Sequence, residues 1–253
     1  MQLILLSSLL FPFFIGLISG FGSGLFGIGG GSIRIPLLNL IGYPLIITYG
    51  INMFTIPVSC SIGAYTQREN MDIRIGKFMI VGGVIGTIVG TVIAFLLSAS
   101  ALILALLFVG ASVLTVIGMN LKYITPSMSQ RLSPSPHAIT GGALAANIIG
   151  GMKGGSGGSL FSPLLKSFNV EIHRAIATSL FSVIFTSIVG VILYWSNGQL
   201  LIIEGLAVLA GSIFGTRLGS KKSLKAKSKS LEIGLSIVVI VLASITLFKA
   251  LIV

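Results

Sequence analysis

The sequence has very little charge for its length. Only 8% of the 253 residues are charged and five are acidic, whereas 54% are hydrophobic. A soluble domain of this size would need more charge, and apolar stretches of about 18 or more residues indicate transmembrane helices. The composition excludes a soluble protein and predicts an all-α polytopic membrane protein.

Residues suited to catalysis or metal binding are also scarce. Cys60 is the only cysteine, which excludes an intramolecular disulfide, and no histidine or second cysteine lies near it at ligand spacing. The apolar stretches contain no cluster of His, Glu and Asp and no activated Ser or Cys. We therefore expect neither an enzyme nor a cofactor or metal site.

Basic residues outnumber acidic ones by 16 to 5, which gives a net charge of +11. A nucleic-acid partner would be one explanation, but the basic residues gather in short segments between apolar stretches, as the positive-inside rule describes. We expect no nucleic-acid partner, a multi-pass protein of the cytoplasmic (inner) membrane, and cytoplasmic loops at 66–77, 120–136 and 217–230. The lysines of 217–230 could also contact anionic membrane lipid, although the cytoplasmic orientation of this loop is a sufficient explanation for their presence. No basic residue precedes Arg34, so the first apolar stretch is expected to be a retained membrane segment rather than a cleaved signal peptide.

A glycine-rich run occurs twice. GIGGGSIRIPLL at 27–38 and GGSGGSLFSPLL at 154–165 superpose when the chain is shifted by 127 residues, with identities mainly at glycine, serine and proline. The same shift places Phe54 on Phe181 and Gly63 on Gly190. These matches predict an internal duplication with a first repeat at 1–119, a cytoplasmic linker at 120–136 and a second repeat at 137–253, all within one membrane domain.

Each glycine-rich run is predicted to break the chain. Glycine costs about 1 kcal/mol per residue in a helix, so adjacent glycines favour breaks, here at 22–31 and 151–158. The alternative, close helix packing through small residues, accounts better for the glycines at 82–90 and 211–219. A short helix is expected after each break, at 32–41 and 159–168, and its N-terminal N–H groups would attract an anion. The other predicted helices are 3–20, 45–66, 78–97, 101–119, 137–150, 172–195, 200–219 and 231–251.

The charge pattern predicts that the two repeats are inverted in the membrane. If 217–230 is cytoplasmic, the 196–199 turn is outside, whereas the corresponding 66–77 loop is inside by its own charge. Each repeat is then a glycine-broken hairpin, made of a helix and a short helix, followed by three transmembrane helices. In inverted repeats, broken segments meet near the membrane midplane and form the binding site.

Candidate binding residues are the polar and glycine residues of the breaks and of the spans that follow them. Ser32 and Ser159 begin the short helices, where capping is the alternative role. Lys153 would bring a positive charge to the site unless it extends to the interface. For Arg34 a lipid-facing or interface position is the alternative, and for Glu204 an interfacial position is favoured over proton coupling. The substrate-binding prediction comprises Gly29, Gly30, Gly31, Ser32, Asn52, Asn147, Lys153, Ser156, Gly157, Gly158, Ser159, Thr178 and Ser179.

These paired motifs are similar to those of the TauE/SafE family of sulfite exporters. The resemblance covers the two glycine-rich runs, the stretches TYGINMFT at 48–55 and AIATSLFS at 175–182, and the patterns GGVIGTIVG at 82–90 and AGSIFGTRLG at 210–219. It implies transport of small sulfur-containing anions, such as sulfite or organosulfonates, across the cytoplasmic membrane. The first repeat departs from the usual small-residue pattern at Tyr49, Asn52 and Met53.

The sequence thus favours a secondary transporter that exports a small anion by alternating access at the two breaks. Outward movement of one negative charge is favoured by about 2.3 kcal/mol per 100 mV, so export needs no coupling ion. The alternatives are a passive anion channel and a transporter of another small anion, such as a carboxylate. Expected partners are the small anion and membrane lipid, and a homodimer is left open.

Overall fold

The computed structural model describes residues 2–124, 135–155 and 158–252, and within these ranges every regular element is a helix. Seven of the described helices are long and apolar enough to cross a membrane, which confirms the polytopic all-α prediction. The elements in chain order are α1 (Gln2–Phe26), α2 (Gly31–Leu40), α3 (Leu45–Thr66), the 3₁₀ turn η1 (Arg68–Asn70), α4 (Ile73–Leu96), α5 (Ala101–Ile124), α7 (Pro136–Met152), α8 (Gly158–Ser167), α9 (Ile172–Ser196), α10 (Ile202–Lys225) and α11 (Ser228–Ile252).

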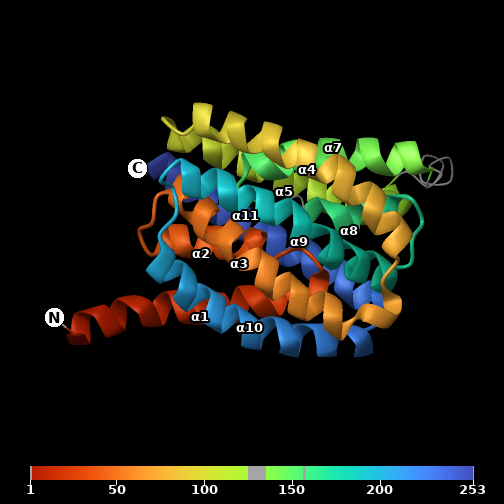
Figure 1. Ribbon diagram of the computed structural model, residues 1–253, viewed down its shortest axis with the longest axis horizontal. Helices are drawn as coiled ribbons and strands as arrows, with labels where there is room; N and C mark the ends of the chain where they lie inside the picture. Colours follow the sequence, from red (N-terminus) through yellow and green to blue (C-terminus); the bar gives the residue numbers. More distant parts are fainter. Residues whose placement is uncertain (1, 125–134, 156–157, 253) are drawn as a thin grey trace.

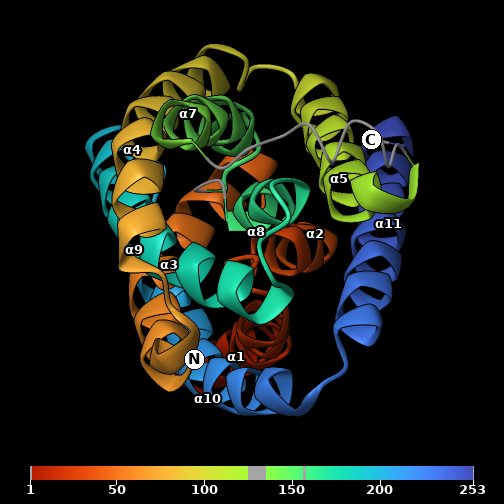
Figure 2. The same ribbon diagram turned by 90° about the vertical axis from the view of Figure 1, so that its right-hand side faces the viewer.

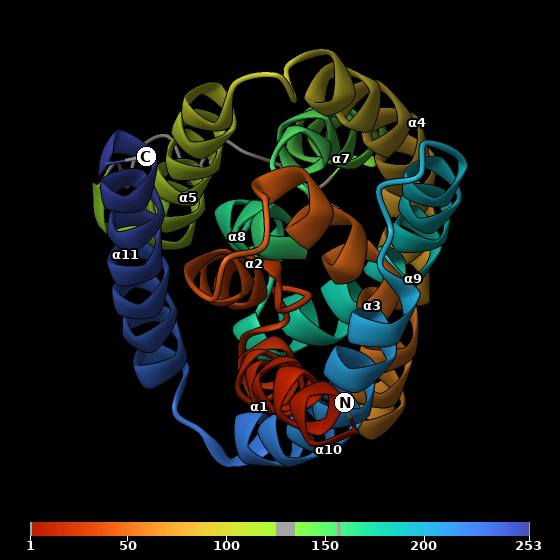
Figure 3. The same ribbon diagram turned by 90° about the vertical axis from the view of Figure 1, so that its left-hand side faces the viewer.

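The helices lie side by side along the long axis of the molecule (Figure 1). The connections before α4, α9 and α11 lie at the right-hand end, and those before α3, α5 and α10 lie at the left-hand end. Viewed from either end, the short helices α2 and α8 are in the middle, surrounded by the longer helices (Figures 2 and 3). The two glycine-rich segments therefore lie inside the bundle.

Each short helix is the returning arm of a hairpin. α1 begins at the left-hand end in Figure 1 and α2 returns toward that end, whereas α7 begins at the right-hand end and α8 returns toward it. The hairpins thus enter from opposite ends, and their tips lie between those ends.

The first break is shorter than the sequence predicts. The expected break at 22–31 is wrong in its first half, because α1 continues to Phe26 and only residues 27–30 are non-helical. Gly24, which lies within the predicted break, stays helical because it lets α1 approach α10 closely: a Cβ on Gly24 would lie 2.3 Å from the Thr216 carbonyl oxygen. The contact with α10 offsets the low helix propensity of glycine.

The packing explanation for the later glycines is confirmed. A Cβ on Gly215 would lie 2.1 Å from the Leu17 carbonyl oxygen, and one on Gly82 would lie 2.0 Å from the Thr140 carbonyl oxygen. Glycine therefore permits backbone contact between α1 and α10 and between α4 and α7. Two long helix pairs are held together in this way without large side chains between them.

Several helix ends also differ from the predicted ones. Span 45–66 is confirmed as α3, but α10 continues to Lys225, so most of the predicted 217–230 loop is helical. The basic side chains of that segment need water but do not prevent helix formation, since lysine and arginine are good helix formers. α5 continues to Ile124, and the rest of the 120–136 linker up to residue 134 lies outside the described residues.

Candidate anion site between the two glycine breaks

The two glycine breaks meet in the interior of the protein. Gly27, Gly29 and Gly30 have φ angles of 70°, 70° and 78°, and Gly154 has φ 71°, which is a left-handed conformation that residues with a Cβ rarely adopt. Gly158 begins α8 so close to the first break that a Cβ there would lie 3.1 Å from the Ile28 carbonyl oxygen. Glycine is needed both for the backbone conformation and for this approach.

Each break is hydrogen-bonded by a side chain from the other half of the chain. Asn52 on α3 donates from Nδ2 to the Gly154 carbonyl at 2.8 Å. Ser179 on α9 donates from Oγ to the Gly27 carbonyl at 2.9 Å. The 127-residue shift that aligns the glycine runs relates Asn52 to Ser179 and Gly27 to Gly154, so the two contacts are equivalent.

A small cavity lies where the breaks meet. Its volume is about 10 Å³, which is room for about one water molecule. It is lined by both breaks, by the starts of both short helices and by α3: Ile28, Gly31, Ser32, Ile35, Asn52, Ile56, Lys153, Gly155, Gly158 and Ser159. Six of the predicted binding residues therefore face one space, although they come from four separate segments.

Two polar groups on this cavity are unpaired. Lys153 and Ser32 are each 1% exposed, and among the described residues neither Lys153 Nζ nor Ser32 Oγ has a hydrogen-bond partner. The Lys153 ammonium lies 5.5 Å from the centre of the Phe108 ring, a weak substitute for the water it has lost. A buried, unpaired ammonium is costly, and an anion in the cavity would offset that cost.

Arg34 is a second buried cation beside the site. The sequence left open a lipid-facing or interface position for this residue, and that alternative is wrong because α2 is surrounded by other helices and Arg34 is 0% exposed. Its guanidinium donates to Ser19 Oγ at 3.2 Å, to Asn52 Oδ1 at 2.8 Å and to Ser212 Oγ at 2.9 Å. The sequence does contain a signal for a buried role of Arg34, because a charged residue stands in an apolar stretch only four positions after a glycine break.

The remaining predicted residues have other positions. Gly29 and Gly30 form the first break, and the Gly30 carbonyl accepts from the N–H groups of Ile33 and Arg34 at the start of α2. Asn147 lies between α7 and α4, where its Oδ1 accepts from Thr87 Oγ1 at 3.0 Å. Ser156 and Gly157 lie outside the described residues.

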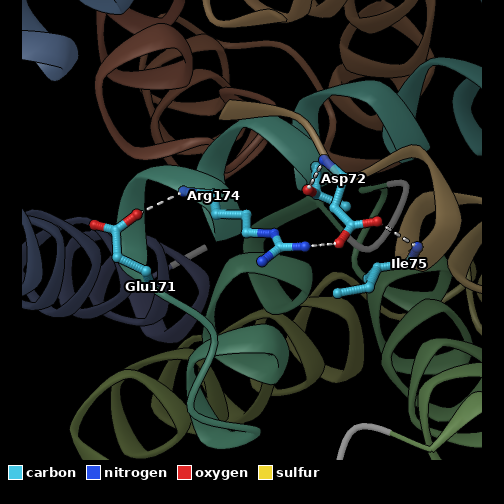
Figure 4. Close-up of polar contacts among 5 residues, drawn as sticks. Asp72, Ile75, Glu171 and Arg174 are labelled. Atoms are coloured by element: carbon cyan, nitrogen blue, oxygen red, sulfur yellow. Dashed lines mark hydrogen bonds and ion pairs between the residues drawn. The ribbon is translucent and has the colours of Figure 1, made fainter. Parts of the chain in front are cut away.

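Thr178 lies in the second turn of α9 and is not among the residues that line the cavity. It contacts the polar cluster of Asp72 and Arg174 that joins the start of α9 to the start of α4 (Figure 4). Its Oγ1 accepts from the Asp72 N–H at 3.0 Å. Asp72 caps α4 by accepting from the Ile75 N–H at 3.0 Å, and its carboxylate forms an ion pair with Arg174. Burial alone would raise the pKa of Asp72, but these hydrogen bonds and the Arg174 charge outweigh it and leave the pKa below its usual value. The cluster joins the connection before α4 to α9.

No three His, Cys, Asp or Glu side chains within the described ranges are grouped so that they could hold a metal ion. Chemistry at the cavity therefore rests on backbone N–H groups, hydroxyls, one amide and the Lys153 cation, with Arg34 beside it. The N–H groups and the cations favour an anionic ligand, and the hydroxyls can donate a hydrogen bond to one.

Comparison with known proteins agrees with this chemistry. The family model described as "Sulfite exporter TauE/SafE" matches residues 12–246. The chain is also similar to a protein of Bacillus subtilis (strain 168) named "Probable membrane transporter protein YunE", with 30% identity over 101 residues, or 40% of this chain. That alignment spans 37% of the length of the relative. No solved structure matches the chain.

Proposed function

The chain belongs to the TauE/SafE sulfite exporter family, and on this basis we propose that it is a secondary transporter of a small sulfur-containing anion, sulfite or an organosulfonate. The anion binds between the two glycine breaks, and transport proceeds by alternating access. The observation that carries this proposal is the buried Lys153 ammonium, which has no hydrogen-bond partner among the described residues and lines the cavity between both breaks.

The chemistry of the cavity suits an oxyanion. The N–H groups at the starts of α2 and α8 have no helical acceptor, and both helix dipoles favour negative charge there. Ser32 Oγ and Lys153 Nζ can donate to oxygen atoms without losing an existing partner. Arg34, in contrast, already has three side-chain acceptors, so it contributes charge and holds Asn52 in place.

The size of the cavity supports a carrier rather than an open channel. Room for about one water molecule is too little for an anion with three oxygen atoms, so the structure corresponds to a closed state of the site. Binding and release then require the hairpin tips to separate. A channel would instead need a continuous aqueous path.

Equivalent residues of the two halves pack against the two breaks. A Cβ on Gly154 would lie 2.0 Å from Tyr49 Cγ, and a Cβ on Gly27 would lie 2.8 Å from Ile176 Cγ2. The 127-residue shift relates Tyr49 to Ile176 as well as the glycines. We interpret the halves 1–119 and 137–253 as inverted repeats joined by the 120–136 linker, with Tyr49 and Ile176 as the side chains that move when each side opens.

A wider cavity is lined by Leu104, the residue to which the Tyr49 hydroxyl donates. Its volume is 230 Å³, and it lies at the end of the bundle that holds the 97–100 turn. The Leu104 carbonyl accepts from the Tyr49 hydroxyl at 3.3 Å. Lys249 and Asn39 provide polar groups on its wall. This cavity fits an exit path on the outer side of the membrane.

The basic segments 66–77 and 217–230 share the opposite end, which the positive-inside rule assigns to the cytoplasm. Anion movement from that end to the other is favoured by about 2.3 kcal/mol per charge at 100 mV, negative inside. Export therefore needs no coupling ion.

Anion flux in proteoliposomes tests the proposal. Purified protein is reconstituted, a potential is imposed, and the movement of sulfite, sulfoacetate, thiosulfate, sulfate, chloride and acetate is compared. The expected result is saturable flux of one sulfur anion, reduced at least about tenfold in Lys153→Met because a charge-assisted hydrogen bond is lost. Lys225→Met removes an exposed positive charge at the end of α10 and serves as the control, with unchanged flux.

The other outcomes separate the alternatives. Equal, non-saturating passage of all six anions would identify a channel. Saturable flux of acetate alone would identify a carboxylate transporter, and no flux of any anion would contradict the proposed transport of sulfur anions.

A further inference from the structure

A groove on the outer surface of the bundle lies between α3 and α10, near the end that carries the basic segments. Its volume is 540 Å³. The α10 side consists of Ile213, Arg217 and Lys221, which follow one another at intervals of four and so share one face of the helix. Two successive turns at the end of α3, including Tyr65, form the opposite side. Two helices thus present one shared surface to the membrane.

The groove concentrates positive charge. None of its lining residues is acidic, and within the described part of the chain neither Arg217 nor Lys221 forms an ion pair. The Arg68 guanidinium lies 4.8 Å from the centre of the Tyr65 ring and adds a third cation at the rim. A ligand held there would be anionic.

The surroundings of the groove are apolar. Val58, Phe214 and Leu218 on the same two helices are 42%, 61% and 60% exposed and face outward. In a membrane protein such side chains contact hydrocarbon, and tyrosine is enriched where hydrocarbon meets the head groups. The cations therefore lie at the edge of an apolar surface, so the matching ligand has both an anionic and a hydrocarbon part.

We propose that this groove is a binding site for an anionic phospholipid of the adjacent leaflet. The phosphate lies between Arg217 and Lys221, and one acyl chain lies along the exposed apolar residues of α3 and α10. Inorganic phosphate has the same charge but would leave the apolar wall uncovered. The inference depends on the membrane location of the protein and not on which anion it transports.

A lipid in this position would hold α3 against α10. Both helices supply partners of the buried Arg34, Asn52 from α3 and Ser212 from α10. The lipid should therefore stabilise the folded protein, because it binds the folded arrangement and not the separated helices.

Native mass spectrometry of the detergent-purified chain tests this site. The protein is titrated with phosphatidylglycerol and, separately, with phosphatidylcholine of the same acyl chains. We expect tighter binding of phosphatidylglycerol, weakened about thirtyfold in Arg217→Gln/Lys221→Gln, since two cations near the head group are removed. The double variant Lys225→Gln/Lys227→Gln removes the same charge outside the groove and should bind like the unchanged protein. Arg217→Lys/Lys221→Arg keeps the charge and should retain binding.

Three results would overturn the proposal. They are equal binding of both lipids, an equal loss in the two glutamine variants, and displacement of phosphatidylglycerol by an equal concentration of inorganic phosphate. The thermal midpoint gives a second measurement: phosphatidylglycerol should raise it in the unchanged protein and not in Arg217→Gln/Lys221→Gln.

Discussion

The side-chain amide of Asn52 donates to the backbone carbonyl of Gly154, 102 residues away, at 2.8 Å. The same side chain accepts from the Arg34 guanidinium through Oδ1, also at 2.8 Å. Asn52 therefore joins the second break to the buried cation of the first hairpin. Its equivalent in the other half, Ser179, donates to the Gly27 and Gly158 carbonyls and bonds no charged group among the described residues. The two halves are alike in backbone and unlike in charge.

This difference predicts unequal effects of removing the two side chains. Asn52→Ala should lower the thermal midpoint more than Ser179→Ala, because it also leaves the Arg34 charge short of one acceptor. Loss of a neutral hydrogen bond costs about 1 kcal/mol, and loss of a bond to a charged group costs about 1.5–3 kcal/mol. Thermal unfolding of the two detergent-purified variants measures both losses of stability. Equal midpoints of Asn52→Ala and Ser179→Ala would contradict the assigned role of Asn52.

Arg34 should be the more sensitive of the two buried cations to substitution. Arg34→Met leaves Ser19, Asn52 and Ser212 without their shared donor and should lower the thermal midpoint by about 10 °C. Lys153→Met removes an ammonium that has no hydrogen-bond partner in the described part of the chain, and should leave the midpoint unchanged or higher. Arg74→Ala, at an exposed position, controls for loss of charge. A larger fall in thermal midpoint for Lys153→Met than for Arg34→Met would show that Lys153, not Arg34, stabilises the interior.

Close approach of α10 to α1 predicts opposite results for two helical glycines. In Gly215→Ala the added methyl group would meet the Leu17 carbonyl oxygen, so the helices must separate and the thermal midpoint should fall. Gly110→Ala on α5 meets nothing within 4 Å, and should raise stability by up to about 1 kcal/mol through helix propensity. A midpoint of Gly215→Ala equal to that of the unchanged protein would contradict the backbone contact.

The ion pair at the end of the bundle predicts a pH-dependent contribution to stability. The pKa of Asp72 is lowered in the folded protein, so its contribution is present above the unfolded pKa of about 3.9 and is lost as the pH falls through the folded pKa. Asp72→Asn keeps a capping oxygen for α4 but removes the charge. The difference in thermal midpoint between the unchanged protein and Asp72→Asn should therefore shrink between pH 6 and pH 3. Because Arg174 is largely exposed, the full effect should be at most about 1 kcal/mol.

Cysteine labelling can test the proposed orientation, since Cys60 is the single native cysteine and is buried. In a Cys60→Ala background, Ser98→Cys and Asn197→Cys should react with an impermeant reagent added to intact cells. Glu69→Cys and Lys227→Cys should react only after the membrane is opened. All four native side chains are exposed, so reactivity reports sidedness rather than burial. The opposite pattern would reverse the proposed direction of export.

The sequence by itself determined the membrane location, the helices and the approximate positions of the breaks. Hydrocarbon requires long apolar helices with internal backbone hydrogen bonds, and adjacent glycines weaken a helix wherever they occur, so both features can be recognised locally. The shift of 127 residues likewise identified Asn52 with Ser179 and Gly27 with Gly154 before any contact between them was known.

Only the tertiary structure decided which polar residues meet. Asn147 and Thr178 look as suitable as Asn52 and Ser179, yet Asn147 packs against α4 and Thr178 bonds Asp72. For Arg34 the sequence left open a lipid-facing or interface position, and the residue is buried, while Gly22 and Gly24 were predicted to lie in a break and are helical. The reason is that all these helices are apolar on most sides, so hydropathy sets no preferred rotation about the helix axis. Rotation and depth depend on close contacts between distant segments, such as Gly24 with Thr216, which a single stretch of sequence does not contain.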